Sequence, residues 1–206
     1  VGANIDDIAK GMGLDKRIGG KFLHTGPGYG GSCFPKDTLA LVKTAKKYKS
    51  EVSIVDQTIK YNDFRKKHMV KKIQSSVDNL SDKNIAILGL SFKPETDDMR
   101  DAASLVIVDE LTKRGAKISA YDPKAITEAK EYYFKNNTSI KYAEKKYDVV
   151  ENADALILLT EWKEFRSPDF EKLRAKLKNA IIFDGRNQYN AFNLKEIEFE
   201  YFQIGV

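Results

Sequence analysis

Cys33 is the single cysteine of the chain, and it follows a glycine-rich run at Gly26–Ser32. Because glycine carries no side chain, the backbone of such a run can approach a ligand closely. Pro35 comes directly after the cysteine, and proline suits the first position of a helix. The sequence therefore predicts a helix beginning at Pro35, with a thiol presented at its N-terminus. That pattern indicates covalent thiol chemistry beside a bound, phosphorylated substrate.

A lone cysteine is more often a small buried hydrophobe than a nucleophile. Here the helix dipole, the unpaired N–H groups of the first turn and nearby Lys36 all favour a reactive thiolate. The glycine run is not a P-loop, because the pattern Gly-x-x-x-x-Gly-Lys-[Ser/Thr] is absent. We favour a nucleophile in a ligand-binding loop. The alternative is a structural cysteine in a non-catalytic nucleotide-binding or dimerisation module.

Short apolar runs alternate with helical patterns in the second part of the chain. This alternation predicts βαβ units and a mostly parallel, Rossmann-like sheet of the α/β class. Residues 1–80 are predicted to form a preceding helical segment, and residues 81–206 the α/β domain. Strands are expected over 84–90, 117–123, 153–160, 180–184 and 199–204. Helices are expected over 4–12, from Pro35 onward, over 52–78 and over 102–113.

Three cations, Lys93, Arg100 and Arg186, come after predicted strands. Ligands of parallel sheets bind at the carboxyl ends of the strands, so these cations are candidates to face a phosphate. The glycine pattern Gly-x-Gly-x-x-Gly is missing after the strand that ends at Gly89, so the dinucleotide fingerprint is absent. Asp122 could mimic a ribose-binding carboxylate, but we interpret it as a turn residue before Pro123.

Two predicted helices have apolar stripes. In the first, Leu39, Val42 and Ala45 are expected to be buried. In the helix over 52–78, polar Asn62 and Lys66 share the row of the apolar residues Val55, Ile59, Met69, Ile73 and Val77. A helix of that length, with little sequence left to cover it, indicates the interface of a homodimer.

Composition limits the other possibilities. The net charge is +5, but basic residues are spread along the chain and mixed with acidic ones, so we expect a solvated surface and no nucleic acid partner. No apolar stretch is long enough to cross a bilayer, and a single cysteine suits a reducing, cytoplasmic location. The chain begins with Val1 rather than Met, inside a helical pattern, so we expect a piece of a longer protein.

These segments together resemble the UDP-glucose 6-dehydrogenase family, within the broader nucleotide-sugar dehydrogenases. The similarity runs from residue 1 to about residue 190. GDP-mannose dehydrogenases share a similar cysteine motif, and the alternative of GDP-mannose or another nucleotide sugar stays open. The matching segments are Arg17–Gly19, Phe22–Asp37, Gly89–Arg100, Tyr121–Pro123, Leu159–Trp162 and Asp184–Asn187.

The resemblance implies NAD-dependent, two-step oxidation of the C6 alcohol of a UDP-sugar to a carboxylate, through a thiohemiacetal and a thioester. Arg17 matches a residue that reaches the substrate of a neighbouring subunit. The resemblance assigns catalysis to Cys33 and Asp37, substrate binding to Arg17, Phe22, Leu23, His24, Thr25, Gly26, Tyr29, Gly30, Phe92, Lys93 and Arg186, and NAD contacts to Lys36 and Arg100.

The chain also departs from the family pattern. We expect the family's N-terminal NAD-binding domain, and the helix that carries its catalytic lysine and asparagine, to lie before residue 1 and outside the given residues. We therefore expect the end of the central domain followed by the UDP-binding domain, inactive by itself.

Overall fold

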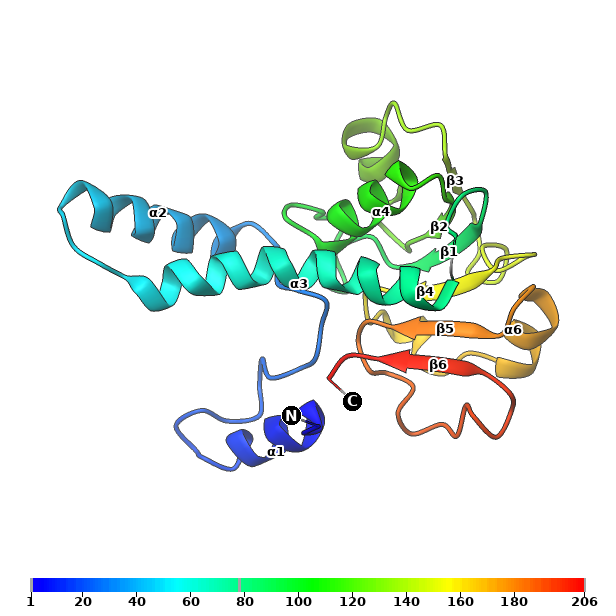
Figure 1. Ribbon diagram of the computed structural model, residues 1–206, viewed down its shortest axis with the longest axis horizontal. Coiled ribbons are helices and arrows are strands. Elements are labelled where there is room, and N and C mark those ends of the chain that lie inside the picture. The colour runs from blue at the N-terminus through cyan, green and yellow to red at the C-terminus, as the bar shows by residue number, and fades with distance from the viewer. Residues whose placement is uncertain (1, 78, 206) are drawn as a thin grey trace.

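Six strands form one sheet in the computed structural model, which describes residues 2–77 and 79–205 (Figure 1). Their order is β3-β2-β1-β4-β5-β6, and every pairing among the described residues is parallel. The order reverses between β1 and β4, which defines a topological switch point. The predicted Rossmann-like sheet is confirmed. The strands are β1 (Asn84–Leu88), β2 (Lys117–Tyr121), β3 (Ile140–Tyr142), β4 (Ala155–Leu158), β5 (Ile181–Asp184) and β6 (Glu200–Gln203).

Other elements cover both faces of the sheet. The central strands β4 and β5 are therefore buried along their whole length. One face packs against α4 and the second half of α3, and the other packs against α6 and the aromatic residues Trp162, Phe165 and Tyr189. The helices are α1 (Ile5–Gly13), α2 (Cys33–Lys47), α3 (Ser53–Val77), α4 (Ala103–Lys113), α5 (Ile126–Glu128) with the π-helical turn η1 (Ala129–Tyr133), the 3-10 turn η2 (Lys163–Phe165) and α6 (Phe170–Lys176).

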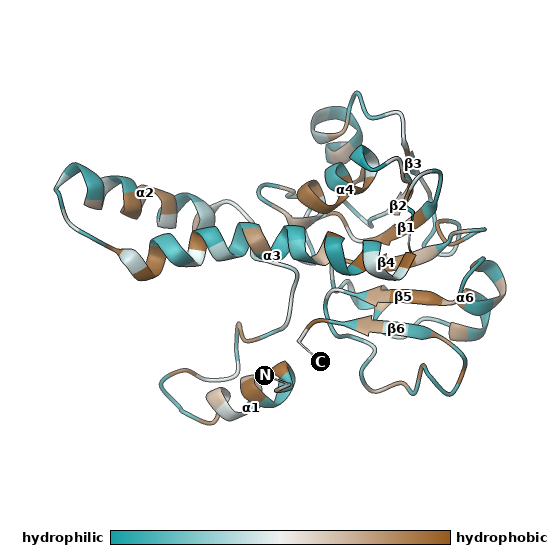
Figure 2. Ribbon diagram, viewed as in Figure 1, coloured by the Kyte–Doolittle hydropathy of each residue, from teal (hydrophilic) through white to brown (hydrophobic). Residues whose placement is uncertain are grey.

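The long helix α3 has two halves with different surroundings. Its second half contributes Met69, Val70, Ile73 and Val77 to the core of the sheet. Its first half runs beside α2 as a hairpin that projects from the sheet (Figure 1). The hydropathy colouring shows brown and teal bands alternating along both helices of this hairpin (Figure 2). The predicted helix over 52–78 is confirmed; residue 78 itself lies outside the described residues.

Two details of α2 differ from the expectations. The helix begins at Cys33, two residues before Pro35, because proline is tolerated throughout the first turn, where backbone N–H groups have no helical acceptor. Val42 and Ala45 are buried as predicted, but Leu39 is 47% exposed. The buried stripe of α2 is narrower than predicted, because α2 packs against the single helix α3 and only the side chains that face α3 are covered.

The helix α1 lies against the C-terminal segment that follows β6. Asn4 caps the helix by accepting hydrogen bonds from the backbone N–H groups of Asp6 and Asp7. The Ile5 N–H donates to the Gly205 carbonyl at 2.9 Å, and the Asn190 side-chain amide donates to Asp6 Oδ2 at 2.5 Å. These bonds join the first described helix to the carboxyl side of the sheet. Among the described residues, no helix combines the length and apolarity needed to span a bilayer.

Candidate functional site

The Cys33 thiol lies at the first residue of α2 and is exposed. Ser32 precedes the helix without donating or accepting a capping hydrogen bond through its side chain, and its Oγ lies 3.7 Å from Cys33 Sγ. The free N–H groups of the first turn therefore point toward the surroundings of the sulfur. The prediction of a thiol at a helix N-terminus is confirmed, with the cysteine itself as the first helical residue.

The glycines of the Gly26–Ser32 run lie against three other parts of the protein: the turn after β5, the helix α3 and the segment that follows β1. At each glycine, an added Cβ would come within 3.0 Å of a protein atom, which is closer than real Cβ atoms come. The glycines therefore let the loop pack tightly onto the rest of the protein. Protein atoms, rather than open space, lie where their side chains would be. The nearest atom to such a Cβ would be Arg186 Nη1 for Gly26 (2.8 Å), Asn62 Oδ1 for Gly28 (2.9 Å), the Asp101 carbonyl oxygen for Gly30 (2.5 Å) and Phe92 Cε2 for Gly31 (2.7 Å).

Gly31 joins the cysteine loop to the segment that follows β1. Its N–H donates to the Arg100 carbonyl at 2.7 Å, and its φ of +90° lies in the left-handed region, where side chains are disfavoured. The Phe92 ring packs on the same glycine. Two predicted site segments, far apart in sequence, are thus brought together two residues from the thiol.

Arg186 is the most enclosed of the predicted cations. Its Nε donates to the Leu159 carbonyl at 2.7 Å and lies 3.0 Å from Glu161 Oε2, as an ion pair without hydrogen-bond geometry. Burial lowers the pKa of the Arg186 guanidinium, and the charges of Glu161 and Asp184 act in the opposite direction. The side chain crosses the carboxyl edge of the sheet and reaches Gly26 of the cysteine loop.

Asp184, the last residue of β5, fixes the turn that carries Arg186. Its Oδ1 accepts from the Arg186 N–H at 2.9 Å, and its Oδ2 accepts from the Tyr189 N–H at 2.8 Å and the Tyr201 hydroxyl at 2.9 Å. Burial raises the pKa of the Asp184 carboxyl despite these donors. Asp184 is therefore a residue that positions Arg186 rather than a ligand-binding residue.

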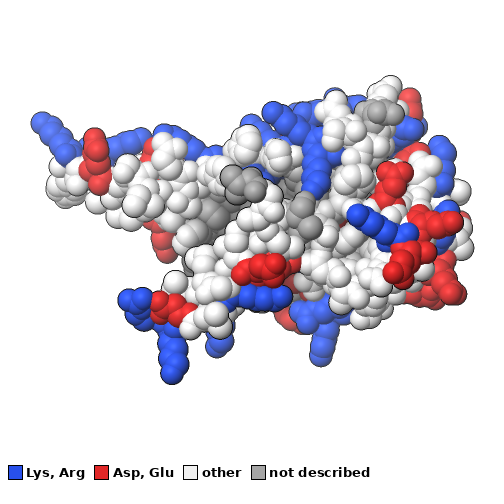
Figure 3. Space-filling view, turned by 60° about the horizontal axis from the view of Figure 1, so that its bottom comes forward, with Lys and Arg blue, Asp and Glu red and all other residues white. Residues whose placement is uncertain are grey.

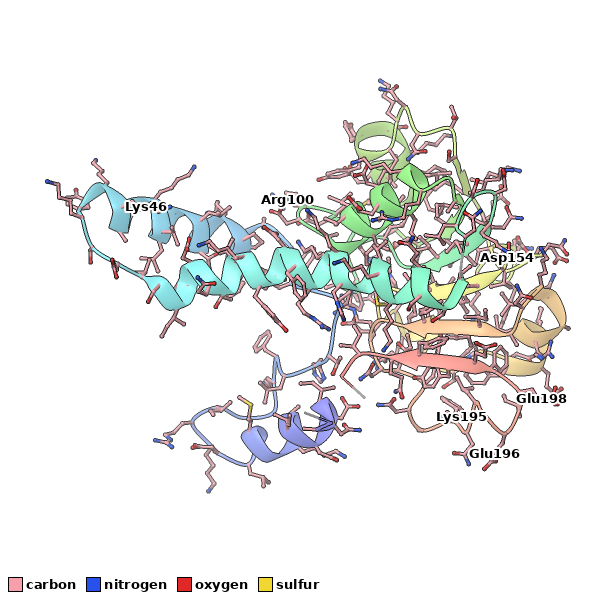
Figure 4. All side chains as sticks on the ribbon, viewed as in Figure 1. Lys46, Arg100, Asp154, Lys195, Glu196 and Glu198 are labelled. Atoms are coloured by element: carbon pink, nitrogen blue, oxygen red, sulfur yellow. The ribbon has the colours of Figure 1, made fainter. Side chains whose placement is uncertain are left out.

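Lys93 and Arg100 are exposed, and neither lies in the buried position of Arg186. Lys93 Nζ lies 5.3 Å from the centroid of the Phe92 ring. Arg100 forms a two-point pair with Asp98, with 2.9 Å from Nε to Oδ1 and 2.7 Å from Nη2 to Oδ2. Figure 4 shows Arg100 on the side of the sheet from which the α2–α3 hairpin projects, whereas Asp154 lies at the opposite end of the strands.

This pair predicts a small pH dependence of stability. The hydrogen bond from Arg100 lowers the pKa of Asp98, so the pair stabilises the fold above the ordinary carboxyl pKa of about 4 and ceases to do so as the pH falls through the lowered value. Arg100→Met should reduce the free energy of unfolding only slightly at pH 7, because Arg100 is exposed and solvent screens the pair, and by still less at pH 2. Urea denaturation at both pH values measures the difference. An equal loss of unfolding free energy at both pH values contradicts a stabilising ion pair between Asp98 and Arg100.

At the switch point between β1 and β4, side chains pack closely on the backbone that follows β1. Gly89 has a φ of +92°, and a Cβ there would lie 2.4 Å from Thr160 Cβ. The Thr160 hydroxyl donates to the Ser91 carbonyl at 2.6 Å, and the Ser104 hydroxyl donates to the Leu90 carbonyl. The residues that follow Gly89 therefore lack the further glycines that let a backbone approach a pyrophosphate, in agreement with the missing dinucleotide fingerprint.

Asp122, at the end of β2, accepts six hydrogen bonds and is buried. This confirms the interpretation of Asp122 as a turn residue and leaves its carboxylate unavailable to a ribose. The donors to Oδ1 are the N–H groups of Lys124 (2.9 Å) and Ala125 (2.9 Å), and the donors to Oδ2 are the N–H groups of Leu90 (2.7 Å) and Ser91 (3.0 Å), the Ser91 hydroxyl (3.1 Å) and Trp162 Nε1 (3.2 Å).

Four other predicted residues, Lys36, Asp37, Arg17 and Phe22, are exposed, whereas Thr25 is buried. Lys36 and Asp37 are exposed and form an ion pair with 3.0 Å between Nζ and Oδ1. Arg17 lies beyond α1, where it pairs with Asp15 at 2.5 Å and is 89% exposed, so the structure does not bring it to the thiol. Phe22 is 96% exposed with a φ of +65°.

A cavity of about 820 Å³ lies between the cysteine loop and the first half of α3. It brings together four predicted substrate residues, His24, Gly26, Tyr29 and Arg186. Sequence reasoning did not assign its α3 wall, although the polar Asn62 in an apolar row was a signal for that face. The wall is formed by Ser53, Ile54, Gln57, Thr58, Tyr61, Asn62 and Arg65.

Comparisons with known proteins agree with this arrangement. The sequence profile of the central domain of the UDP-glucose/GDP-mannose dehydrogenase family matches residues 1–64, and the profile of the UDP binding domain of that family matches residues 86–191. The chain is 45% identical to a UDP-glucose 6-dehydrogenase of Rhizobium meliloti and 41% identical to UDP-glucose 6-dehydrogenase YwqF of Bacillus subtilis. Each match covers all of this chain and 46% of the relative, so the chain spans about half the length of these relatives.

Solved structures give the same result. A UDP-glucose dehydrogenase from Pyrobaculum islandicum superposes with a TM-score of 0.83 at 28% identity, over 99% of this chain and 44% of the other. An NDP-N-acetyl-D-galactosaminuronic acid dehydrogenase from Methanosarcina mazei superposes with a TM-score of 0.80 at 28% identity, over the same shares of the two chains. Because the two profiles together cover most of the sequence, the chain belongs to the UDP-glucose/GDP-mannose dehydrogenase family.

Proposed function

We propose that this chain supplies the thiol nucleophile and the nucleotide-sugar-binding domain of a UDP-glucose 6-dehydrogenase. The observation that carries the proposal is the position of Cys33. The thiol is exposed at the start of α2, on a loop that contacts Phe92 and Arg186 at the carboxyl side of the UDP-binding sheet. A sugar whose diphosphate is held at that edge can extend toward the sulfur. UDP-glucose is the proposed substrate because the two relatives described above are named for it.

In the proposed reaction, a hydride and a proton first leave the C6 alcohol, giving an aldehyde. The Cys33 thiolate adds to the aldehyde carbon and forms a C–S bond, and the former carbonyl oxygen takes up a proton. Loss of a second hydride and that proton gives a thioester. Water then adds to the thioester carbon, the C–S bond breaks, and the carboxylate, the thiolate and two protons are released. Asp37 is the proposed partner of the hydrolytic water.

NAD is the proposed hydride acceptor, and two hydrides require two molecules of it. Because this sheet lacks the glycine fingerprint of a dinucleotide site, we assign NAD to a domain outside residues 1–206. Lys36 and Arg100 are exposed near the loop and are the proposed contacts from this chain. The proposal therefore treats residues 1–206 alone as inactive and as half of a cytoplasmic enzyme.

The first half of α3 is the proposed interface of a homodimer. Ile54 is 82% exposed, Tyr61 is 61% exposed and Phe64 is 48% exposed, so apolar side chains remain uncovered along the hairpin. On the face drawn in Figure 3, basic side chains are interspersed with acidic ones. That distribution supports a protein partner at the hairpin over a nucleic acid.

Two alternatives remain candidates. Relatives that act on other nucleotide sugars, including the one from Methanosarcina mazei, share the fold, so GDP-mannose or an N-acetylated sugar is the alternative substrate. A non-catalytic nucleotide-binding module is the alternative of a different class, and it predicts that Cys33 alkylates no faster than a free thiol. Isothermal titration of the chain with UDP-glucose, GDP-mannose and UDP-N-acetylmannosamine separates the substrates.

The role proposed for Lys93 predicts a change in binding. Lys93→Ala should weaken UDP-glucose binding by about tenfold, because an exposed charge-assisted contact to phosphate contributes about 1–2 kcal/mol. The maximal rate of the full-length enzyme should change less than this affinity. Titration calorimetry measures the affinity, and Lys124→Ala, another exposed lysine, is the matched control. An unchanged dissociation constant for Lys93→Ala counts against phosphate contact.

A further inference from the structure

Two polar side chains are buried in the middle of α3, one turn apart. Asn62 is 8% exposed and Lys66 is 5% exposed. Buried polar groups of this kind are stable only when they have hydrogen-bond partners. The partners of both residues lie outside the helix. They belong to the cysteine loop and to the segment that follows β1, so neither residue serves the helix itself.

Asn62 binds a single residue of the cysteine loop twice. Its Oδ1 accepts from the Tyr29 N–H at 2.8 Å, and its Nδ2 donates to the Tyr29 carbonyl at 3.1 Å. A side-chain amide that pairs with both backbone groups of one residue fixes the orientation of the peptide groups on either side. Gly28, with a φ of +144°, lies so close that an added Cβ would be 2.9 Å from Asn62 Oδ1 and 2.9 Å from Lys66 Cγ.

Lys66 extends this connection to a second segment. Its Nζ donates to the Asp101 carbonyl at 2.9 Å. The same carbonyl lies against Gly30, and the preceding residue, Arg100, accepts the hydrogen bond from Gly31. Burial lowers the pKa of the Lys66 ammonium, whereas the charges of Asp101 and Asp63 raise it. One face of α3 therefore holds both the cysteine loop and the segment that follows β1.

We propose that Asn62 and Lys66 are positioning residues for the nucleophile. They act through Tyr29 and through Asp101, and they hold the loop that ends at Cys33 against the segment that carries Phe92. Neither residue is required to touch the sugar. The inference rests on the proposed function only in taking Cys33 as the nucleophile.

The test uses Asn62→Leu and Lys66→Met, which keep the size of each side chain and remove its hydrogen-bonding groups. Lys67→Met, an exposed neighbour on the same helix, is the matched control, and Lys66→Arg is the conservative variant. Amide hydrogen exchange of Gly31 is the first readout, because Gly31 loses no partner of its own in either variant. The rate of Cys33 alkylation by iodoacetamide, measured from pH 6 to pH 10, is the second.

We expect the Gly31 amide to exchange about tenfold faster in both variants, while the amides of β1 and β4 stay protected. The alkylation profile of Cys33 should change in the same two variants, and Lys67→Met and Lys66→Arg should match the unmodified chain. A purely structural role lowers the free energy of unfolding and moves neither readout in the folded chain. If either readout is unchanged in both variants, the proposal is overturned.

If Asn62→Leu does not fold, Asn62→Asp replaces it, since it keeps the acceptor for the Tyr29 N–H and loses the donor to the Tyr29 carbonyl. Neither readout requires turnover. A full-length Cys33→Ser enzyme that still produces NADH would therefore refute the proposed function. The positioning role would still be decided by the exchange of the Gly31 amide and the alkylation of Cys33. In the full-length enzyme, Asn62→Leu should lower kcat by about tenfold with little change in KM.

Discussion

Replacing Cys33 with serine should lower NADH production by the full-length enzyme by roughly 10³-fold or more, because the C–S bond of the proposed intermediate can no longer form. UDP-glucose affinity should stay within about twofold, since the sulfur is a small part of the contact surface. Absorbance of NADH at saturating substrate measures the first effect, and titration calorimetry measures the second. The loss comes from chemistry alone, because Cys33 is exposed and packs against no core cluster.

Ser32→Ala is the matched control for this experiment. Ser32 lies beside the thiol, with 3.7 Å between the two side-chain atoms, and provides no cap to α2. Its removal should leave turnover within a few-fold of the unmodified enzyme. Normal NADH production by Cys33→Ser would refute the covalent mechanism and favour the non-catalytic module.

Replacing Asp122 with alanine should reduce the free energy of unfolding by about 4 kcal/mol. Its carboxylate accepts six hydrogen bonds at the end of β2, and each buried donor left without an acceptor costs about 1–3 kcal/mol before relaxation. Water entering the space recovers part of that loss. Urea denaturation of the 206-residue chain measures the change.

Asp97→Ala is the control for the Asp122 experiment, because Asp97 is an exposed carboxylate in the segment that follows β1. It should change the free energy of unfolding by less than about 0.5 kcal/mol. A similarly small effect of Asp122→Ala would show that the six donors find other acceptors. Because Leu90 and Ser91 lead directly into Phe92, the Asp122 variant should also weaken UDP-glucose binding in any fraction that stays folded.

The sheet could be predicted from the sequence because its central strands are continuous apolar runs. The strands β1, β4 and β5 are buried on both faces, and such runs are typical of a parallel sheet. The edge strand β3 was missed, since Ile140–Tyr142 has three residues and a lysine in the middle. The short helix α6 was missed as well. The proposed boundary between residues 80 and 81 stays a prediction.

The candidate site could be predicted in its chemistry but not in its packing. The thiol, the helix N-terminus and the strand-end cations are visible as residue types at short spacing. The partners of the loop glycines are not visible, because Gly28 meets α3 and Gly26 meets Arg186 only after the chain folds. The roles of Lys36 and Asp37 stay predictions, since they depend on ligands that would approach exposed side chains.

The helix α3 also sets a limit on how this sequence can vary in length. The helix has 25 residues and no interruption, so its two halves keep a fixed rotation relative to each other. A residue inserted between Lys66 and Met69 would turn the first half by about 100° relative to the core stripe. Asn62 would then face away from the cysteine loop although every side chain was retained. Insertions and deletions should therefore be less harmful in the turn between α2 and α3 than inside α3, because a change in the turn does not rotate Asn62 relative to the core stripe.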